Sequence, residues 1–333
     1  MPSRPQKAFE EFRSIIQHGQ RFILTTHVNP DGDGLGCEIA LARFLQAQGK
    51  QTTILNHSAT PSYYLYLDQR AEIHQFQASQ HQQAIQEADV IIVLDTNTPD
   101  RLVSLKSHVL ASKAKKVCID HHLDKSDFAD LYILDESSAA TGEILYRLLE
   151  FLGGSRFDGE TATALYTALM TDTGSFRFPK TTPDNHRQVA HLLECGANPA
   201  AIYQNVYEQG SAGRLQLLGN VLSTLEVVHD GKVACITVTK RMLEDTGTSE
   251  PDTDNMVNYT LTIRGVQIGL MLTELSDGVK ISFRSKGEIW INKLAKEFGG
   301  NGHQNAAGAR VHDTTVARVR EKVFELSKRY IIQ

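Results

Sequence analysis

The first 120 residues contain three short apolar runs, each bounded by polar residues. They lie at residues 22–26, 90–94 and 116–119. Short continuous apolar runs are typical of strands buried on both faces of a parallel sheet. Longer patterns with helical spacing separate or follow them, at residues 35–48, 139–152 and 160–171. This alternation predicts a doubly wound, mainly parallel α/β domain.

The second part of the chain has a different pattern. Helical spacing occurs at residues 184–194, 200–207, 213–225 and 314–329, and strand-like runs occur at 233–239, 267–272 and 279–284. The polar stretch 247–254 predicts a loop. We expect a first domain over residues 1–195, a linker or hinge over 196–215, and a smaller mixed α/β domain over 216–333. An active-site cleft is expected between the two domains.

The composition is that of an ordinary globular protein. The 333 residues suggest two domains at ~150 residues each, and 41% of them are hydrophobic. The four cysteines, Cys37, Cys118, Cys195 and Cys235, form no CxxC pair. Their scatter argues against a disulfide framework or a thiolate zinc site and suits the cytoplasm. The apolar runs are too short to span a membrane, so no membrane association is expected.

The charge is unevenly distributed. Asp and Glu outnumber Lys and Arg by 25 to 19 in residues 1–215, whereas the counts are 14 and 15 in residues 216–333. Proteins that bind long nucleic acid duplexes use a basic surface, which the first part of the chain does not supply. An acidic surface is a better place to hold divalent cations. We therefore expect no long duplex as a partner.

Each of the three apolar runs of the first domain is followed by side chains that bind metals. The first leads to His27, Asp31 and Asp33, the second to Asp95, and the third to Asp120, His121 and His122. Ligands bind at the carboxyl ends of the strands in an open α/β sheet. These groups would therefore meet at one edge of the sheet, where their negative charges would repel one another unless cations lie among them.

A fourth acidic position follows a predicted helix. Asp172 comes directly after the helical pattern 160–171. Ligands that mix imidazole and carboxylate favour manganese, with magnesium, cobalt or iron as alternatives. Two such ions about 4 Å apart would clamp a phosphoryl group and generate a hydroxide for attack. Asp95 is the candidate for a ligand shared by both ions.

A glycine-rich segment near the C-terminus is a second candidate site. Gly300, Gly302 and the neighbouring His303 lie in a stretch with few bulky side chains, where backbone amides can approach a phosphate. Arg284 and Ser285 end the strand-like run that precedes it. An arginine at this position is a plausible partner for a phosphate group.

These motifs resemble those of a known family. HVNPDGDG, VLDT, the DHH triplet and TDTGSF resemble, in this order, the motifs of the DHH phosphoesterases. GGNGHQNAAG together with SFRS resembles the DHH-associated C-terminal domain of the oligoribonuclease-like, or nano-RNase, branch of that family. The resemblance extends over about residues 10 to 330.

The resemblance implies a role for each matching residue. One metal ion would be held by His27, Asp31 and Asp95, and a second by Asp33, Asp95, His121 and Asp172. Asp120 would orient His121 or lie close to the metals. His122 would contact the substrate phosphate and protonate the leaving oxygen. Substrate contacts would come from Arg101, Arg284, Ser285, Gly300, Gly302 and His303.

The expected activity is hydrolysis of short phosphate esters with two divalent ions as cofactors. Substrates would be short oligoribonucleotides, the dinucleotides pApA and pGpG, or the nucleotide bisphosphate 3′-phosphoadenosine-5′-phosphate. Four alternatives stay open: an inorganic pyrophosphatase, a RecJ-like exonuclease, a cyclic-dinucleotide (c-di-AMP) phosphodiesterase and a non-enzymatic nucleotide-binding protein. A homodimer is also left open.

Overall fold

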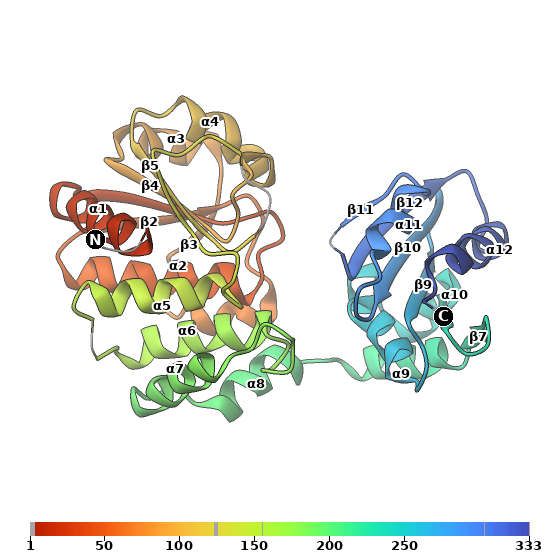
Figure 1. Cartoon of the computed structure of the whole chain (residues 1–333). Helices are drawn as coiled ribbons and strands as arrows, with labels where there is room; N and C mark the ends of the chain where they lie inside the picture. The colour runs from red at the N-terminus through yellow and green to blue at the C-terminus, as the bar shows by residue number, and fades with distance from the viewer. Residues whose placement is uncertain (1–3, 123–125, 155, 303, 333) are drawn as a thin grey trace. The chain divides into compact units, whose positions relative to one another are not determined.

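Residues 4–122, 126–154, 156–302 and 304–332 are described by the computed structural model, in which the chain divides into two units (Figure 1). The units are Met1–Gln209 and Gly210–Gln333. The division lies inside the segment 196–215, and the role of this segment as a hinge stays a prediction.

The first unit is built on a parallel sheet. Among the described residues its strand order is β3-β2-β1-β4-β5-β6, and every neighbouring pair is parallel. The strands are β1 (Arg21–Thr25), β2 (Gln51–Asn56), β3 (Ile73–Gln75), β4 (Val90–Leu94), β5 (Lys115–Asp120) and β6 (Leu131–Leu134). The doubly wound α/β architecture predicted from the sequence is confirmed.

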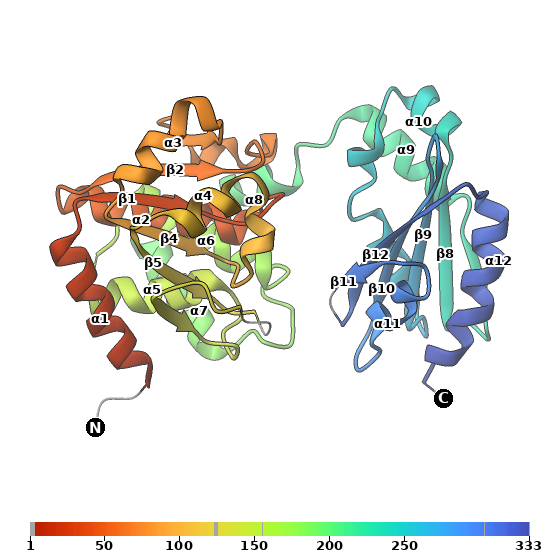
Figure 2. The ribbon, with the colours of Figure 1, turned by 90° about the horizontal axis from the view of Figure 1, so that it is seen from above.

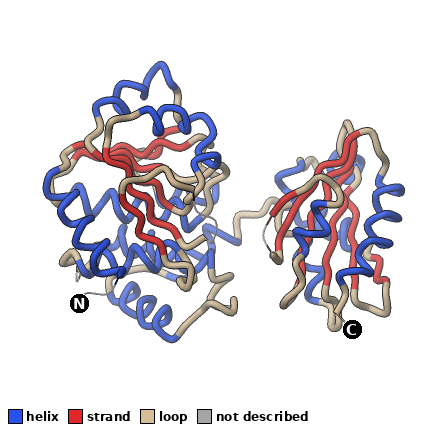
Figure 3. The backbone as a smooth tube through the Cα atoms, turned by 45° about the horizontal axis from the view of Figure 1, so that its top comes forward, coloured by secondary structure: helices blue, strands red, loops and turns tan. Residues whose placement is uncertain are grey.

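Helices cover both faces of this sheet (Figures 1 and 3). They are α1 (Arg4–His18), α2 (Gly32–Ala47), α3 (Ala78–Glu87), α4 (Lys106–Ala111), α5 (Thr141–Phe151), α6 (Gly159–Asp172), α7 (Pro183–Glu194) and α8 (Pro199–Tyr207), with the 3-10 helices η1 (Ser62–Leu67) and η2 (Pro99–Leu105). The larger core lies on the side of α1, α2, α5 and α6, and the smaller one on the side of α3 and α4. Strands between two such layers are buried on both faces, as their apolar runs require.

Three strands and one helix of the first unit lack a strong apolar run. The strand β2 begins with polar residues, β6 is only four residues long with every second residue half-buried, and β3 has the sequence Ile-His-Gln at the sheet edge. The first helix, α1, is amphipathic and packs Phe12 and Ile16 into the larger core. The edge strands β3 and β6 need less apolar sequence because one side faces solvent. The interior strand β2 was overlooked because its first three residues are polar.

Small residues bring α2, α5 and α6 unusually close together. A side chain at Gly36 would collide with the backbone of Ala164, and one at Gly142 would come within 2.6 Å of Ala168 Cβ. Large side chains at these positions would push the helices apart. The close packing sets the N-termini of α2 and α5 beside the C-terminus of α6, and this is where the candidate site lies.

The second unit contains a mixed sheet. Among the described residues its order is β11-β12-β10-β9-β8-β7, with β8 and β9 parallel and the other pairs antiparallel. The strands are β7 (Glu226–Val228), β8 (Val233–Val238), β9 (Ile268–Glu274), β10 (Gly278–Ser285), β11 (Asn301–Gly302) and β12 (Ala306–His312). The smaller mixed α/β fold predicted for this part of the chain is also confirmed.

Each face of the second sheet has its own hydrophobic core. The helices and 3-10 helices are α9 (Ala212–Leu222), α10 (Lys240–Thr246), η3 (Glu250–Thr253), η4 (Met256–Thr262), α11 (Ile291–Lys296), α12 (Val316–Ser327) and η5 (Lys328–Tyr330). Side chains of α11 and α12 fill one core, and side chains of α9 and η4 fill the other. Figure 2 shows α12 running alongside the sheet. In the described part of the chain, no helix combines the length and the apolar character that crossing a membrane requires.

Candidate metal and phosphate site

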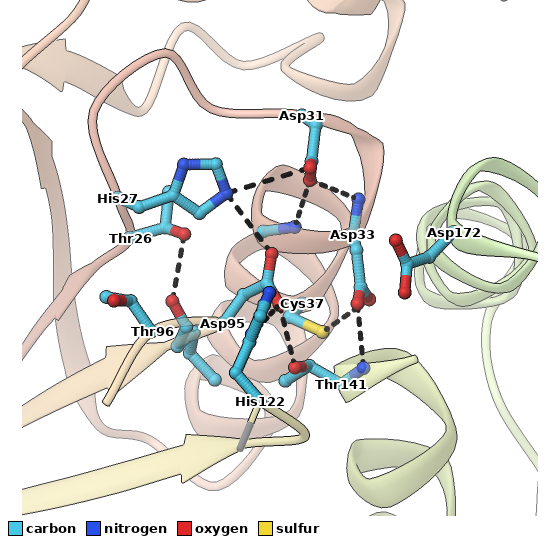
Figure 4. Close-up of polar contacts among 12 residues, drawn as sticks. Thr26, His27, Asp31, Asp33, Cys37, Asp95, Thr96, His122, Thr141 and Asp172 are labelled. Carbon is cyan, nitrogen blue, oxygen red and sulfur yellow. Dashed lines mark hydrogen bonds and ion pairs between the residues drawn. The ribbon is translucent and has the colours of Figure 1, made fainter. Parts of the chain in front are cut away.

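The central strands of the first unit deliver the candidate metal ligands to one edge of the sheet. The strands β1, β4 and β5 are parallel neighbours, so their carboxyl ends lie side by side. His27 follows β1, Asp95 follows β4, and His121 follows β5. The convergence expected from the sequence is therefore present in the structure. Figure 4 shows His27, Asp31, Asp33, Asp95 and Asp172 gathered at this edge.

The segment after β1 is a helix start rather than an extended loop. Asp31 is the N-cap of α2, and its Oδ1 accepts hydrogen bonds from the amides of Asp33 and Gly34 at 3.0 and 3.1 Å. Asp33 consequently lies in the first turn of the helix. Gly34 is required for packing, because a side chain there would collide with the Thr26 hydroxyl.

His27, Asp31 and Asp95 form a first group of donors. His27 Nε2 lies 3.2 Å from Asp95 Oδ2 and 3.7 Å from Asp31 Oδ2. Its Nδ1 lies 2.8 Å from the carbonyl of Val28, so Nδ1 carries a proton and donates it to that carbonyl. In the metal-free chain Nε2 also carries a proton and faces the two carboxylates. A metal ion bound here would take the place of that proton.

Asp33, His121 and Asp172 form a second group beside the first. His121 Nε2 lies 3.3 Å from Asp172 Oδ2 and 3.9 Å from Asp33 Oδ2. The same nitrogen lies 3.7 Å from Asp95 Oδ1. Asp95 therefore has one oxygen toward each group, which is the arrangement expected of a carboxylate shared by two cations.

The carboxylates of these groups repel one another. Burial and the charge of Asp95 raise the pKa of Asp172 to about 8. Burial, Asp95 and Asp172 raise the pKa of Asp33 well above its usual range. Divalent cations would relieve this repulsion, and the oxygen and imidazole donors suit such ions. The residues present thus fit a divalent metal site.

Asp120 pairs with a different histidine from the one expected. Its Oδ1 lies 2.7 Å from His122 Nδ1, whereas Nδ1 of His121 lies 3.3 Å from the carbonyl of Ser138. Of the two roles expected for Asp120, the orientation of His121 is therefore corrected, whereas its place beside Asp95, His121 and His122 agrees with a position close to the metals. Burial lowers the pKa of His122, but the bond to Asp120 and the charge of Asp95 outweigh it, so the pKa is raised overall.

The start of α5 supplies contacts that the sequence did not reveal. The amides of Thr141 and Gly142 donate to the two oxygens of Asp33 at 2.7 and 2.8 Å, and the Thr141 hydroxyl donates to Asp95 Oδ1 at 2.9 Å. A helix N-terminus attracts anions through its unpaired amides. In the sequence, these contacts are indicated only by a threonine near the start of the helical pattern 139–152.

A buried hydrogen-bond chain holds the end of β1. The amide of Thr26 donates to Asn56 Oδ1 at 3.0 Å, and Asn56 Nδ2 donates to Glu38 Oε2 at 2.8 Å. The Thr26 hydroxyl donates to the carbonyl of Leu94 at 2.8 Å. These bonds tie β1, β2, β4 and α2 together at the residues that immediately precede His27 and Asp95.

The other predicted substrate contacts are distributed over both units. Arg101 lies in η2 of the first unit, where its charge acts on His122 and its carbonyl accepts from the amide of Val28 at 2.7 Å. In the second unit, the guanidinium of Arg284 is partly buried and donates to the carbonyl of Phe283 at 3.0 Å. Ser285 is buried, and its hydroxyl donates to the carbonyl of Ile289 at 2.7 Å. This bond favours a structural role for Ser285.

The described part of the glycine-rich segment pairs with β12 in antiparallel orientation. Gly300 and Gly302 approach β12 so closely that a side chain at either position would collide with its backbone. Gly302 has φ of 151° and pairs with Ala307. His303, the remaining predicted substrate contact, lies outside the described residues.

Comparisons with known proteins agree with the motifs. Residues 21–171 match the DHH family N-terminal domain, and residues 230–332 match the DHHA1 domain. A protein from Thermus thermophilus, named bifunctional oligoribonuclease and PAP phosphatase NrnA, is 31% identical over 91% of this chain and 87% of its own length. A cyclic-di-AMP phosphodiesterase from Listeria monocytogenes, PdeA, is 25% identical over 74% of this chain and 37% of its own length.

A solved structure resembles the whole chain. It is the crystal structure of an exopolyphosphatase-related protein from Bacteroides fragilis, which is 32% identical, has a TM-score of 0.93 and covers 97% of both chains. The matched domains together with the identity to the Thermus thermophilus relative show the family. The chain belongs to the DHH family of phosphoesterases and carries a DHHA1 domain in its second unit.

Proposed function

We propose that this protein is a manganese-dependent phosphoesterase. It hydrolyses short oligoribonucleotides and linear dinucleotides such as pApA and pGpG to mononucleotides, and 3′-phosphoadenosine-5′-phosphate to AMP. The observation that carries the proposal is the position of Asp95, whose two oxygens face two separate groups of donors. The likeness to the Thermus thermophilus relative supports the choice of substrates.

Each of the two donor groups would hold one ion. His27, Asp31 and Asp95 would hold one ion, and Asp33, Asp95, His121 and Asp172 would hold the other. When bound, two such ions supply a nucleophilic hydroxide and positive charge that stabilises the transition state. The N-terminus of α5 keeps both oxygens of Asp33 in place, so this carboxylate needs little rearrangement when an ion enters.

His122 is the proposed proton donor. Its bond to the buried Asp120 holds the ring and favours the protonated form. A protonated imidazole can contact the substrate phosphate and then give its proton to the leaving oxygen. The backbone of His122 is held by Asn97, whose side-chain amide donates to the His122 carbonyl at 2.9 Å. Arg101, whose charge acts on His122, would add positive charge for the phosphate.

Arg284 of the second unit would bind the end of the substrate that is remote from the scissile phosphate. Arg284 supplies a guanidinium with donors beyond the one bonded to Phe283, and a terminal phosphate can occupy them. Such a grip would favour short substrates, in which a terminal phosphate lies only one or two nucleotides from the scissile phosphate. The free cysteines favour a reducing compartment, and we propose a cytoplasmic location.

A panel of phosphate esters tests the proposal. Purified protein with manganese would be given RNA of graded length, pApA, pGpG, 3′-phosphoadenosine-5′-phosphate, pyrophosphate and c-di-AMP. The proposal expects the highest kcat/KM on dinucleotides and short RNA. Faster turnover of c-di-AMP would instead assign the chain the activity of its Listeria monocytogenes relative, and turnover of pyrophosphate alone would exclude a nucleotide substrate.

A further inference from the structure

A cavity of about 420 Å³ lies in the first unit beside the segment that follows Asp172. Its walls come from α6, from the turn after it and from α8. The described residues that line it are distinct from those of the candidate metal site. Its volume lies within the range of small-ligand sites, which is about 300–1,000 Å³.

The walls of this cavity have the chemistry of a site for a planar ring. Tyr166, Phe176 and Tyr203 line it, and Tyr203 is 46% exposed, so a face of its ring is accessible. Ser175 adds a hydroxyl. Glu208 is the charged side chain among the described lining residues, and its charge is negative. Aromatic walls stack with nucleobases, whereas a carboxylate repels phosphate and accepts hydrogen bonds from N–H groups.

A strained turn connects this cavity directly to the candidate metal site. Gly174, Ser175 and Phe176 have φ values of 58°, 60° and 64°, which is a left-handed conformation that side chains rarely adopt. The turn is held by a bond of 2.7 Å from the Ser175 amide to the carbonyl of Met170. Such strain persists where the surrounding structure enforces it. Asp172, which precedes this turn, belongs to the second donor group, so both sites share one short segment.

Tyrosine side chains also lie between the cavity and the segment that holds Asp31. The rings of Tyr203 and Tyr207 lie 4.9 Å apart on α8. Burial raises the pKa of Tyr64, and Asp31 and then the neighbouring tyrosines, including Tyr207, add to the effect. Tyr64 forms a hydrogen bond with the backbone of Gly32, the residue after Asp31, and its helix η1 packs against α8. Aromatic side chains thus extend from Tyr203 to the edge of the first donor group.

We propose that this cavity is a subsite for one nucleobase of the substrate. The base stacks on Tyr203 and Phe176 and donates N–H groups to Glu208, while the attached phosphate lies at the candidate metal site. Guanine fits best, because its adjacent N1–H and N2–H groups match a carboxylate. This assignment rests on the proposed function, since it concerns the same substrate.

Two matched tryptophan variants test the subsite. Ala200→Trp fills the cavity, whereas Ala201→Trp adds the same ring at the next residue of α8, which does not line it. With pGpG, Ala200→Trp and Tyr203→Leu should raise KM about tenfold or more with kcat nearly unchanged, as expected for loss of base stacking. Ala201→Trp should behave like the wild type. An abasic dinucleotide with the same phosphates should show little difference among all four proteins.

The outcomes separate this inference from the proposed function. If the wild type cleaves pGpG and Ala200→Trp keeps the wild-type KM, the subsite is wrong and the phosphoesterase stands. If the wild type cleaves no nucleotide, the proposed function fails. Binding of guanosine, followed by saturation-transfer NMR, then decides the subsite by itself. Guanosine binding that is lost in Ala200→Trp and kept in Ala201→Trp supports it, and absence of binding to the wild type overturns it.

Discussion

The hydroxyl of Thr141 donates a hydrogen bond of 2.9 Å to Asp95, the carboxylate that faces both donor groups. The amide of the same residue donates to Asp33 at 2.7 Å. One residue at the start of α5 therefore positions two carboxylates, one from α2 and one that follows β4. Because Thr141 is fully buried, water cannot replace its hydroxyl without a change in packing.

Removal of this hydroxyl should impair catalysis more than folding. Thr141→Val keeps the shape of the side chain but leaves Asp95 free to rotate, and a hydrogen bond to a charged group is worth about 1.5–3 kcal/mol. We expect kcat/KM on pApA to fall about 10- to 100-fold. Thr141→Ser should retain most of the activity because it keeps the donor. Equal activities of the valine and serine variants would show that the hydroxyl does not position Asp95.

The metal-free protein should lose stability as the pH rises. The pKa of Asp172 is raised from 3.8 to about 8 by burial and by the charges of Asp95 and Asp31. His27 is raised from 6.5 to about 10, because bonds and charges from Asp31 and Asp95 outweigh its burial. Both groups hold a proton in the folded chain at pH values where the unfolded chain has released it. Stability therefore decreases between about pH 4 and pH 10.

Manganese should reverse this trend, since it takes the place of the bound protons. The increase in Tm caused by manganese, relative to EDTA, should be small at pH 5 and large at pH 8. Asp172→Asn should reduce both the pH dependence in EDTA and the effect of manganese. Asp184→Asn, which changes an exposed carboxylate of α7, is the matched control. An equal manganese effect at both pH values would contradict binding at these carboxylates.

The sequence predicted those parts of the molecule whose signal is local. The strand 90–94 was predicted with the bounds of β4 because all five of its residues are apolar and buried. The candidate ligands were found because each follows a strand, and parallel strands end together. The partner of Asp120 was not predicted, because the choice between His121 and His122 depends on side-chain rotamers. The role of Thr141 depends on a helix terminus packed against a distant loop, which leaves no local pattern.

Loss of the guanidinium in the second unit should weaken substrate binding. Arg284→Ala removes donors that we assign to the terminal phosphate, so KM for pApA should rise about tenfold or more while kcat changes little. Arg264→Ala, at an exposed position of the same unit, is the control and should leave both constants unchanged. A large fall in kcat with unchanged KM for Arg284→Ala would contradict a gripping role.

The pH profile should reveal the pairing of Asp120 with His122. If His122 must be protonated to donate to the leaving oxygen, kcat/KM falls as the pH rises through its pKa. Asp120→Asn removes the charged acceptor that raises this pKa, and the alkaline limb should therefore move to lower pH by about one to two units. Asn97→Ala loosens the backbone of His122 without changing the charge beside its ring. It should lower kcat and leave the limb in place, whereas an unmoved limb in Asp120→Asn would show that His122 is not the proton donor.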